Sequence, residues 1–204
     1  MLALSRTPVP STALVKLRYC QTVGIDAPAG LCNSRTFRAN SLYDPDYSTT
    51  SSTQHQPMSF DQWSLFYEKY CVLSAKITVT PINITETPLM YGISARQNTH
   101  TASVDPNILK ENGDTCWAYC GNLAKSRSPK QVSKKLSIKR FMGYKNPQDE
   151  DSLKGTASAS PSEVAYFQVW VAAADGLANP PSTSVNIMIE FISLFSSPKH
   201  LAQS

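Results

Sequence analysis

The chain has 204 residues, of which 41% are hydrophobic and 17% charged, and its formal net charge is +4. This length fits one domain of ordinary size, with a core that needs no disulfides. The chain has fourteen prolines and is rich in Ser, Thr and Asn but poor in Glu, Lys and Ala. A chain of this composition forms helices poorly. The composition therefore argues against collagen, coiled coils and helical bundles.

A strict alternation marks residues 12–25 as a strand with one buried face, because apolar side chains fall on one side and Lys16 and Arg18 on the other. Residues 35–43 are expected to form a second strand. It ends at the turn sequence Asp-Pro-Asp over 44–46.

The clearest helix is expected over 59–70, where aromatic residues recur at helical spacing. Ser59 can cap it, with Gln62 three positions on completing a capping box. The helix runs directly into a strand over 71–84. Pro81 interrupts that strand, so we expect it at a sheet edge or a bulge.

The second half of the chain continues mainly as strands, and the apolar run 163–175 is typical of a central strand. A short helix is expected over 105–112, and 144–161 is a polar loop. The other expected strands and apolar segments lie over 88–97, 116–120, 131–143 and 184–195. Seven or eight strands joined by loops of unequal length favour an all-β jelly roll, with an immunoglobulin-like sandwich as the structural alternative.

Positive charge is concentrated in one segment. Between residues 125 and 140 there are seven basic residues and no acidic one. They are Lys125, Arg127, Lys130, Lys134, Lys135, Lys139 and Arg140. Such a one-sided cluster repels itself unless an anion lies beside it, although a plain solvated strand and loop face remains the alternative.

Enzyme motifs are missing from the sequence: it has no nucleophile elbow, no Walker loop and no dinucleotide-binding glycines. Its three histidines are scattered, so we expect neither a metal site nor a cofactor. No stretch approaches the roughly 18 apolar residues of a membrane helix. The five cysteines, odd in number and irregularly spaced, are expected to be free thiols in a reducing compartment.

Two segments carry a family resemblance, FRANSLYDPD (37–46) and HQPMSFDQWSLFYEKYCVLSAKITV (55–79). They resemble the capsid proteins of circovirus-like single-stranded DNA viruses, which show "N-S-x-Y-D-P", "Q-P-x-G-F-D-Q" and "Y-x-x-Y-x-V-x-x-S-x-I-x-V". The matching positions are Asn40, Ser41, Tyr43, Asp44, Pro45, Gln56, Pro57, Phe60, Asp61, Gln62, Tyr67, Tyr70, Val72, Ser74, Ile77 and Val79. Ser59 stands where the family has Gly, and the arginine-rich arm with which family members usually begin has no counterpart here.

The resemblance implies an eight-stranded antiparallel jelly roll of viral capsid type, with one short helix between early strands. It implies one capsid domain over 1–204, with terminal extensions at 1–11 and 198–204. Family members assemble into icosahedral shells, commonly of sixty copies, around a single-stranded DNA genome. The expected locations are the virion and, during assembly, the host nucleus, and a host surface glycan is a further possible partner.

The leading hypothesis is therefore a capsid protein without catalytic activity that contacts its genome through charge. The residues expected to contact phosphate, without reading bases, are Lys16, Arg18, Lys134, Lys135, Lys139 and Arg140. The alternative is a carbohydrate-binding jelly-roll module of lectin type. Exposed Trp63, Trp117 or Tyr119 would then stack on sugar rings.

Overall fold

The computed structural model describes residues 9–47, 55–99, 105–111, 113–122 and 130–200. These residues form mostly β-structure. The strands are β1 (Thr12–Ile25), β2 (Asn33–Arg38), β3 (Tyr67–Ile82), β4 (Leu89–Arg96), β5 (Thr115–Cys120), β6 (Val132–Ser137), β7 (Lys154–Thr156), β8 (Tyr166–Ala173) and β9 (Thr183–Pro198). The helices are α1 (Phe60–Phe66), α2 (Pro106–Glu111) and α3 (Ile138–Met142), with short 3₁₀ turns at Pro147–Asp149 and Asp151–Leu153.

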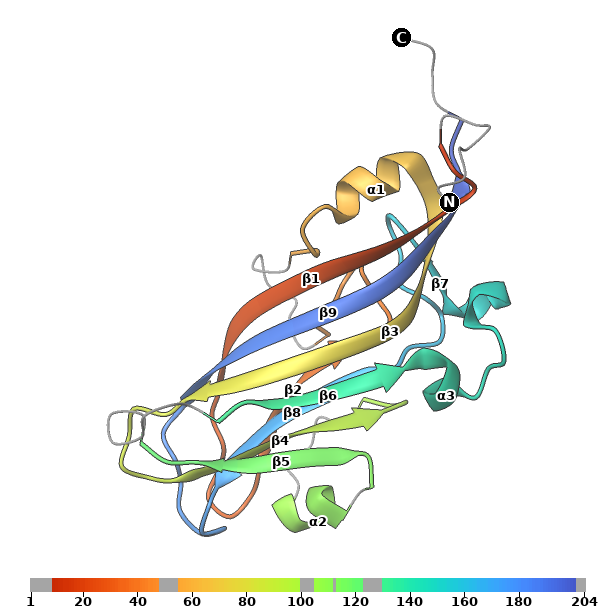
Figure 1. Ribbon diagram of the computed structural model, residues 1–204. Helices are drawn as coiled ribbons and strands as arrows, with labels where there is room; N and C mark the ends of the chain where they lie inside the picture. The colour runs from red at the N-terminus through yellow and green to blue at the C-terminus, as the bar shows by residue number, and fades with distance from the viewer. Residues whose placement is uncertain (1–8, 48–54, 100–104, 112, 123–129, 201–204) are drawn as a thin grey trace.

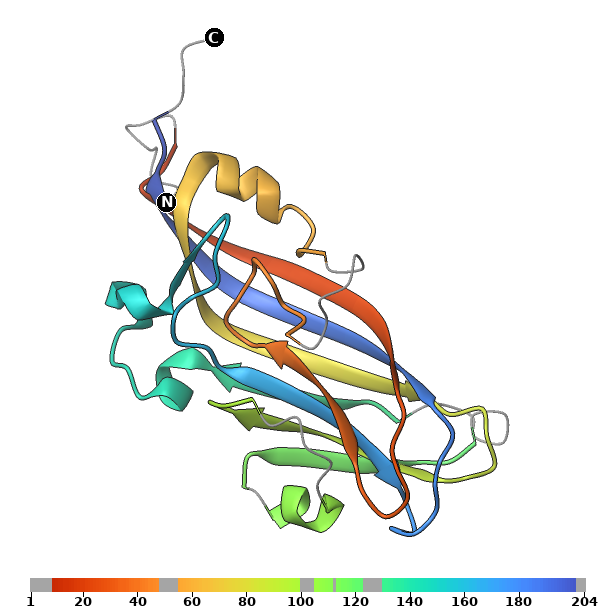
Figure 2. The ribbon, with the colours of Figure 1, turned by 180° about the vertical axis from the view of Figure 1, so that it is seen from behind.

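The strands build two antiparallel sheets that pack face to face. One has the order β1-β9-β3-β6, with the short β7 added to β3, and the other has the order β2-β8-β4-β5. Figure 1 looks onto the first sheet and Figure 2 onto the second. Apart from β7, this is an eight-stranded jelly roll, because strands distant in sequence alternate within each sheet. The expected fold class is confirmed, and α1 lies between β2 and β3 as predicted.

The core lies between the two sheets and follows the alternation seen in the sequence. In β1, Leu17, Tyr19 and Val23 point inward and are buried, whereas Lys16 and Arg18 point outward. The observed bounds of β1 match the predicted range, because half-burial over 14 residues leaves a period of two with no ambiguity.

Pro81 lies in β3 at a position that is locally an edge. On one side it pairs with Val185 of β9. On the other side, the pairing of β3 with β6 ends at Val79 and Val132. The missing amide of proline therefore disrupts no ladder on that side. The irregularity of β3 lies instead between Val72 and Ser74.

The predicted helix over 59–70 is too long. It ends at Phe66, and Tyr67 already belongs to β3. The predicted capping box is also wrong, because the Ser59 side chain makes no capping hydrogen bond. Ser59 instead adopts φ 71°, the left-handed conformation that glycine accepts most easily. This is the position at which the sequence departs from the family pattern.

The predicted strand over 131–143 is wrong in its second half. Strand β6 ends at Ser137, and Ile138–Met142 form helix α3, which stops at Gly143 with φ 80°. The polar loop predicted over 144–161 contains the short strand β7. The second strand is also displaced, since β2 covers 33–38 and not 35–43.

Tyr70 explains why two motif blocks of the sequence occur together. Its hydroxyl oxygen accepts hydrogen bonds from the backbone amides of Leu42 (3.1 Å) and Tyr43 (3.2 Å). The Ser41 hydroxyl lies 3.4 Å from the same oxygen. Tyr70 is buried in β3, so it fixes the turn after β2 to the opposite sheet.

Candidate nucleic-acid interface

The solvent-exposed face of the β1-β9-β3-β6 sheet carries four cations, which we call the cationic face: Lys16, Arg18, Lys76 and Lys135. All four are exposed, whereas their neighbours in sequence, such as Leu17, Ile77 and Leu136, are buried. Three of the cations lie in one row across the sheet, because Arg18 and Lys76 both pair in register with Glu190, and Lys76 pairs with Lys135.

Glu190 is the acidic residue of this row. Its Oε1 accepts hydrogen bonds from Lys16 Nζ at 2.6 Å and from Arg18 Nε at 3.0 Å. The hydrogen bond from Lys16, supported by Arg18, holds the pKa of this carboxyl below its usual value. Glu190 thus balances part of the charge of Lys16 and Arg18, and the cationic face keeps a net positive charge.

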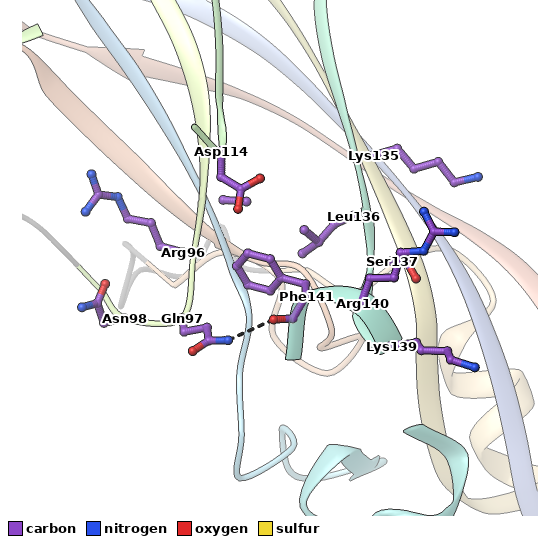
Figure 3. Close-up of a pocket in the computed structure, with 11 residues that line it drawn as sticks. Arg96, Gln97, Asn98, Asp114, Lys135, Leu136, Ser137, Lys139, Arg140 and Phe141 are labelled. Carbon is purple, nitrogen blue, oxygen red and sulfur yellow. Dashed lines mark hydrogen bonds between the residues drawn. The ribbon is translucent and has the colours of Figure 1, made fainter. Parts of the chain in front are cut away.

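Helix α3 extends the positive charge beyond β6. Lys139 and Arg140 are exposed on α3 and extend to the same side as Lys135 in Figure 3. An open hollow of about 1390 Å³ lies beside them between the ends of β4 and β6. The side chain of Gln97 donates to the Phe141 carbonyl at 3.0 Å, which ties α3 to the end of β4. Arg96 also borders the hollow, but its side chain extends to the opposite side in Figure 3.

The structure thus brings five of the six predicted contact residues to one side of the molecule and separates the sixth. Lys134 points the other way, is mostly buried, and lies 3.4 Å from a carboxylate oxygen of Asp114. Lys125 and Arg127 lie outside the described residues. Lys76 was missed by the sequence analysis, although the alternation of Ile77 and Val79 with polar residues places it on the exposed face.

One end of the same sheet face carries uncharged polar side chains instead of cations. Toward one end, a second hollow of about 440 Å³ is lined by Thr22, Thr78, Thr80 and Asn186 among others. The Thr22 hydroxyl donates to the Asn186 side-chain oxygen at 2.6 Å. Hydroxyl and amide groups of this kind bind sugar and phosphate oxygens, so they extend the polar surface next to the cations.

Acidic residues that could have formed a cation site are paired with basic side chains instead. Asp44 contacts Arg38, and Asp46 contacts Arg35. Asp151 contacts both Lys69 and Lys154. No group of three or more metal-ligating side chains occurs in the part of the chain that the structure describes. Within the same residues, no helix has the length and apolar character to cross a membrane.

Two of the three aromatic residues considered for sugar stacking are exposed. Trp117 and Tyr119 lie on β5 with exposed fractions of 41% and 52%, and their rings meet edge to face at 5.4 Å. The Lys110 ammonium lies 5.2 Å from the centre of the Trp117 ring. Trp63 is half-buried and stacks on Phe195 at 5.8 Å, so it contributes to packing.

No protein-family model and no curated protein matches the sequence. Among solved structures, the chain is similar to that of mud crab tombus-like virus, with a TM-score of 0.51 and 8% identity over 98% of this chain and 96% of the other. It is also similar to the virus-like particle of Macrobrachium rosenbergii nodavirus (0.50, 11%, covering 98% and 100%). The 60-mer of the BFDV capsid protein gives 0.50 and 9%, covering 95% and 97%. At identities this low, the structural likeness shows a shared fold alone, the jelly roll.

Proposed function

We propose that this chain is a viral capsid protein that assembles with copies of itself into an icosahedral shell around a small single-stranded DNA genome. The observation that carries the proposal is the jelly-roll strand order, combined with likeness to virus-particle proteins over nearly the full length of both chains. The 60-mer of the BFDV capsid protein supports a shell of the same copy number here. The chain acts as one capsid domain, with residues 1–11 and 198–204 as terminal extensions.

The cationic face is the genome contact of this proposal. It points to the shell interior and binds phosphates through Lys16, Arg18, Lys76 and Lys135, continued by the α3 residues Lys139 and Arg140. Neighbouring strands are about 4.8 Å apart, so a row of cations across the sheet can follow successive phosphates of a single strand. Lysine and arginine held in this way bind charge without reading bases. Lys134 contributes least, because Asp114 balances its charge.

A DNA genome is favoured by the sequence resemblance to circovirus-like capsid proteins. Assembly in the host nucleus, location in the virion and a glycan receptor belong to the same proposal. All of them follow from the resemblance and add no residue to the site.

Electron microscopy of the purified full chain, with the ratio of absorbance at 260 and 280 nm, tests this function. We expect uniform particles that contain nucleic acid protected from added nuclease. Digestion with deoxyribonuclease or ribonuclease after particle disruption identifies the genome type. A dispersed monomer under all assembly conditions would contradict the shell, whereas particles that never hold nucleic acid would contradict the genome contact.

Two double variants distinguish the effect of the cationic face on nucleic acid content from the effect of net charge. Lys76→Thr with Lys135→Thr should give particles with less nucleic acid. The matched control, Lys110→Thr with Lys199→Thr, removes the same charge elsewhere and should leave the content unchanged. Equal losses from both variants would show that net charge alone retains the genome.

The carbohydrate-binding module remains a second candidate because Trp117 and Tyr119 are exposed. Aromatic rings on a sheet surface can stack on sugar rings. In this case the protein would be a monomer or small oligomer with saturable binding on a glycan array. Trp117→Ala would then abolish the glycan binding.

A further inference from the structure

We infer that Glu190 is a built-in counter-anion of the cationic face, and that it sets the strength and salt dependence of nucleic-acid binding there. The inference rests on the proposed genome contact. It assigns to one residue the control of that contact, a role distinct from binding phosphate itself.

The arrangement of the three side chains is that of an occupied anion site. Lys16 and Arg18 both donate to a single oxygen of Glu190, at 2.6 and 3.0 Å. The carboxylate is only 16% exposed, whereas the two cations are 53% and 63% exposed. The cations therefore stand above the carboxylate, and an arriving phosphate meets them first.

Among the described residues, Glu190 is the acidic member of the row that runs from Arg18 to Lys135. Lys16 and Arg18 face it from β1, and Lys76 pairs with it in register from β3. On its own strand the neighbours on the same face are Met188 and Ile192. None of these neighbours is acidic, so the contact of Lys16 and Arg18 with a carboxylate depends on Glu190.

A phosphate that binds Lys16 and Arg18 must therefore compete with Glu190 for them. Without Glu190, Lys16 and Arg18 would neutralise more phosphate charge, so more of the counterions condensed on the nucleic acid would be released, which drives association. With Glu190 in place, part of that release is lost, so binding is weaker and less sensitive to salt. Glu190 also holds the two cations side by side and reduces their repulsion in the empty protein.

Glu190→Gln tests the inference because it keeps the shape of the side chain and removes its charge. If the change frees one cation equivalent, the plot of log affinity against log salt concentration steepens by about 0.7 for a single strand. The variant then binds about fivefold more tightly than the wild type at about 0.1 M salt if the two bind equally at about 1 M. The measurement is fluorescence anisotropy of a labelled oligothymidylate of about 20 nucleotides, titrated with full-chain subunits isolated by size exclusion.

Glu111→Gln is the matched control, since it removes a carboxylate from α2, next to the other sheet. It should leave the salt slope unchanged. Wild-type binding with an unchanged slope in Glu190→Gln would overturn the inference and leave the genome contact standing, as would equal slopes in the two variants. Absence of binding by the wild type would overturn both.

A second variant keeps the test decisive if Glu190→Gln folds poorly. Lys16→Met should reduce the salt slope less than Lys135→Met does, because Lys16 is already partly neutralised by Glu190. Equal reductions would contradict the role of Glu190. Circular dichroism melting of each variant confirms that the comparison is made between folded proteins.

Discussion

Lys76 of β3 and Lys135 of β6 lie directly opposite each other in the sheet register, and both are exposed. Like charges in this position destabilise an antiparallel pair. In the protein without nucleic acid, the repulsion is a cost that a more ordinary pair, such as Lys with Glu, would avoid. A phosphate between the two ammonium groups would remove that cost, which is the relation expected of a binding surface.

Lys135→Thr should accordingly improve stability and weaken binding. Removing the repulsion is expected to raise the unfolding temperature by about 1–3 °C, since such cross-strand terms are about 0.2–1 kcal/mol. The salt slope for a single strand should fall by about 0.7. Ser133→Thr, on the same face of β6, controls for the strand preference of threonine. A drop in stability with unchanged binding would contradict the assignment.

Acid should selectively remove the contribution of Glu190. Its pKa is lowered in the folded protein, chiefly by the hydrogen bond from Lys16, so the stabilisation exists above the unfolded value of 4.5 and is lost as pH falls through the folded pKa. We expect the wild type to melt at a higher temperature than Glu190→Gln at neutral pH, and the gap to narrow as pH falls below 4.5. Melting curves across this range check the prediction, and a gap independent of pH would refute it.

Ser59→Gly should stabilise the protein although it removes a nominal helix cap. Ser59 holds φ 71° and its side chain caps nothing, so the substitution relieves backbone strain without losing a hydrogen bond. After the greater entropy of glycine in the unfolded chain is subtracted, we expect a gain of about 0.5–1 kcal/mol. Thermal and urea unfolding measure it. Ser59→Ala should show no such gain, because alanine retains the strain.

Tyr70→Phe should destabilise the protein by about 2–4 kcal/mol. The change removes the acceptor for two backbone amides, those of Leu42 and Tyr43, and each amide left without a partner costs about 1–3 kcal/mol. Urea unfolding provides the measurement. Tyr119→Phe removes an exposed hydroxyl and should change little. A similar, small effect of both variants would show that water replaces the Tyr70 hydroxyl.

Sequence patterns predicted the fold well wherever one face of a strand is buried over many residues, as in β1. They failed at 138–142, because Ile138 and Met142 are four residues apart and fit a helical face as well as one face of a strand. Gly143, in the left-handed conformation typical of a helix end, was the signal that could have identified α3.

The candidate site was predicted only in part for a different reason. Alternation placed Lys16 and Arg18 on an exposed face, but it could not show that this face continues through Lys76 to Lys135. That continuity depends on strand order, which local patterns do not contain. The contact with Glu190 joins residues 172 positions apart for Arg18, so no short-range signal reports it.

The position of β9 in the sheet has a consequence for the order of events during synthesis. This strand lies between β1 and β3 and is the last strand of the described chain to leave the ribosome. Until it is made, β1 has no partner in its sheet, and the row from Arg18 to Lys135 is incomplete. A nascent chain therefore cannot display the finished cationic face before β9 has been made.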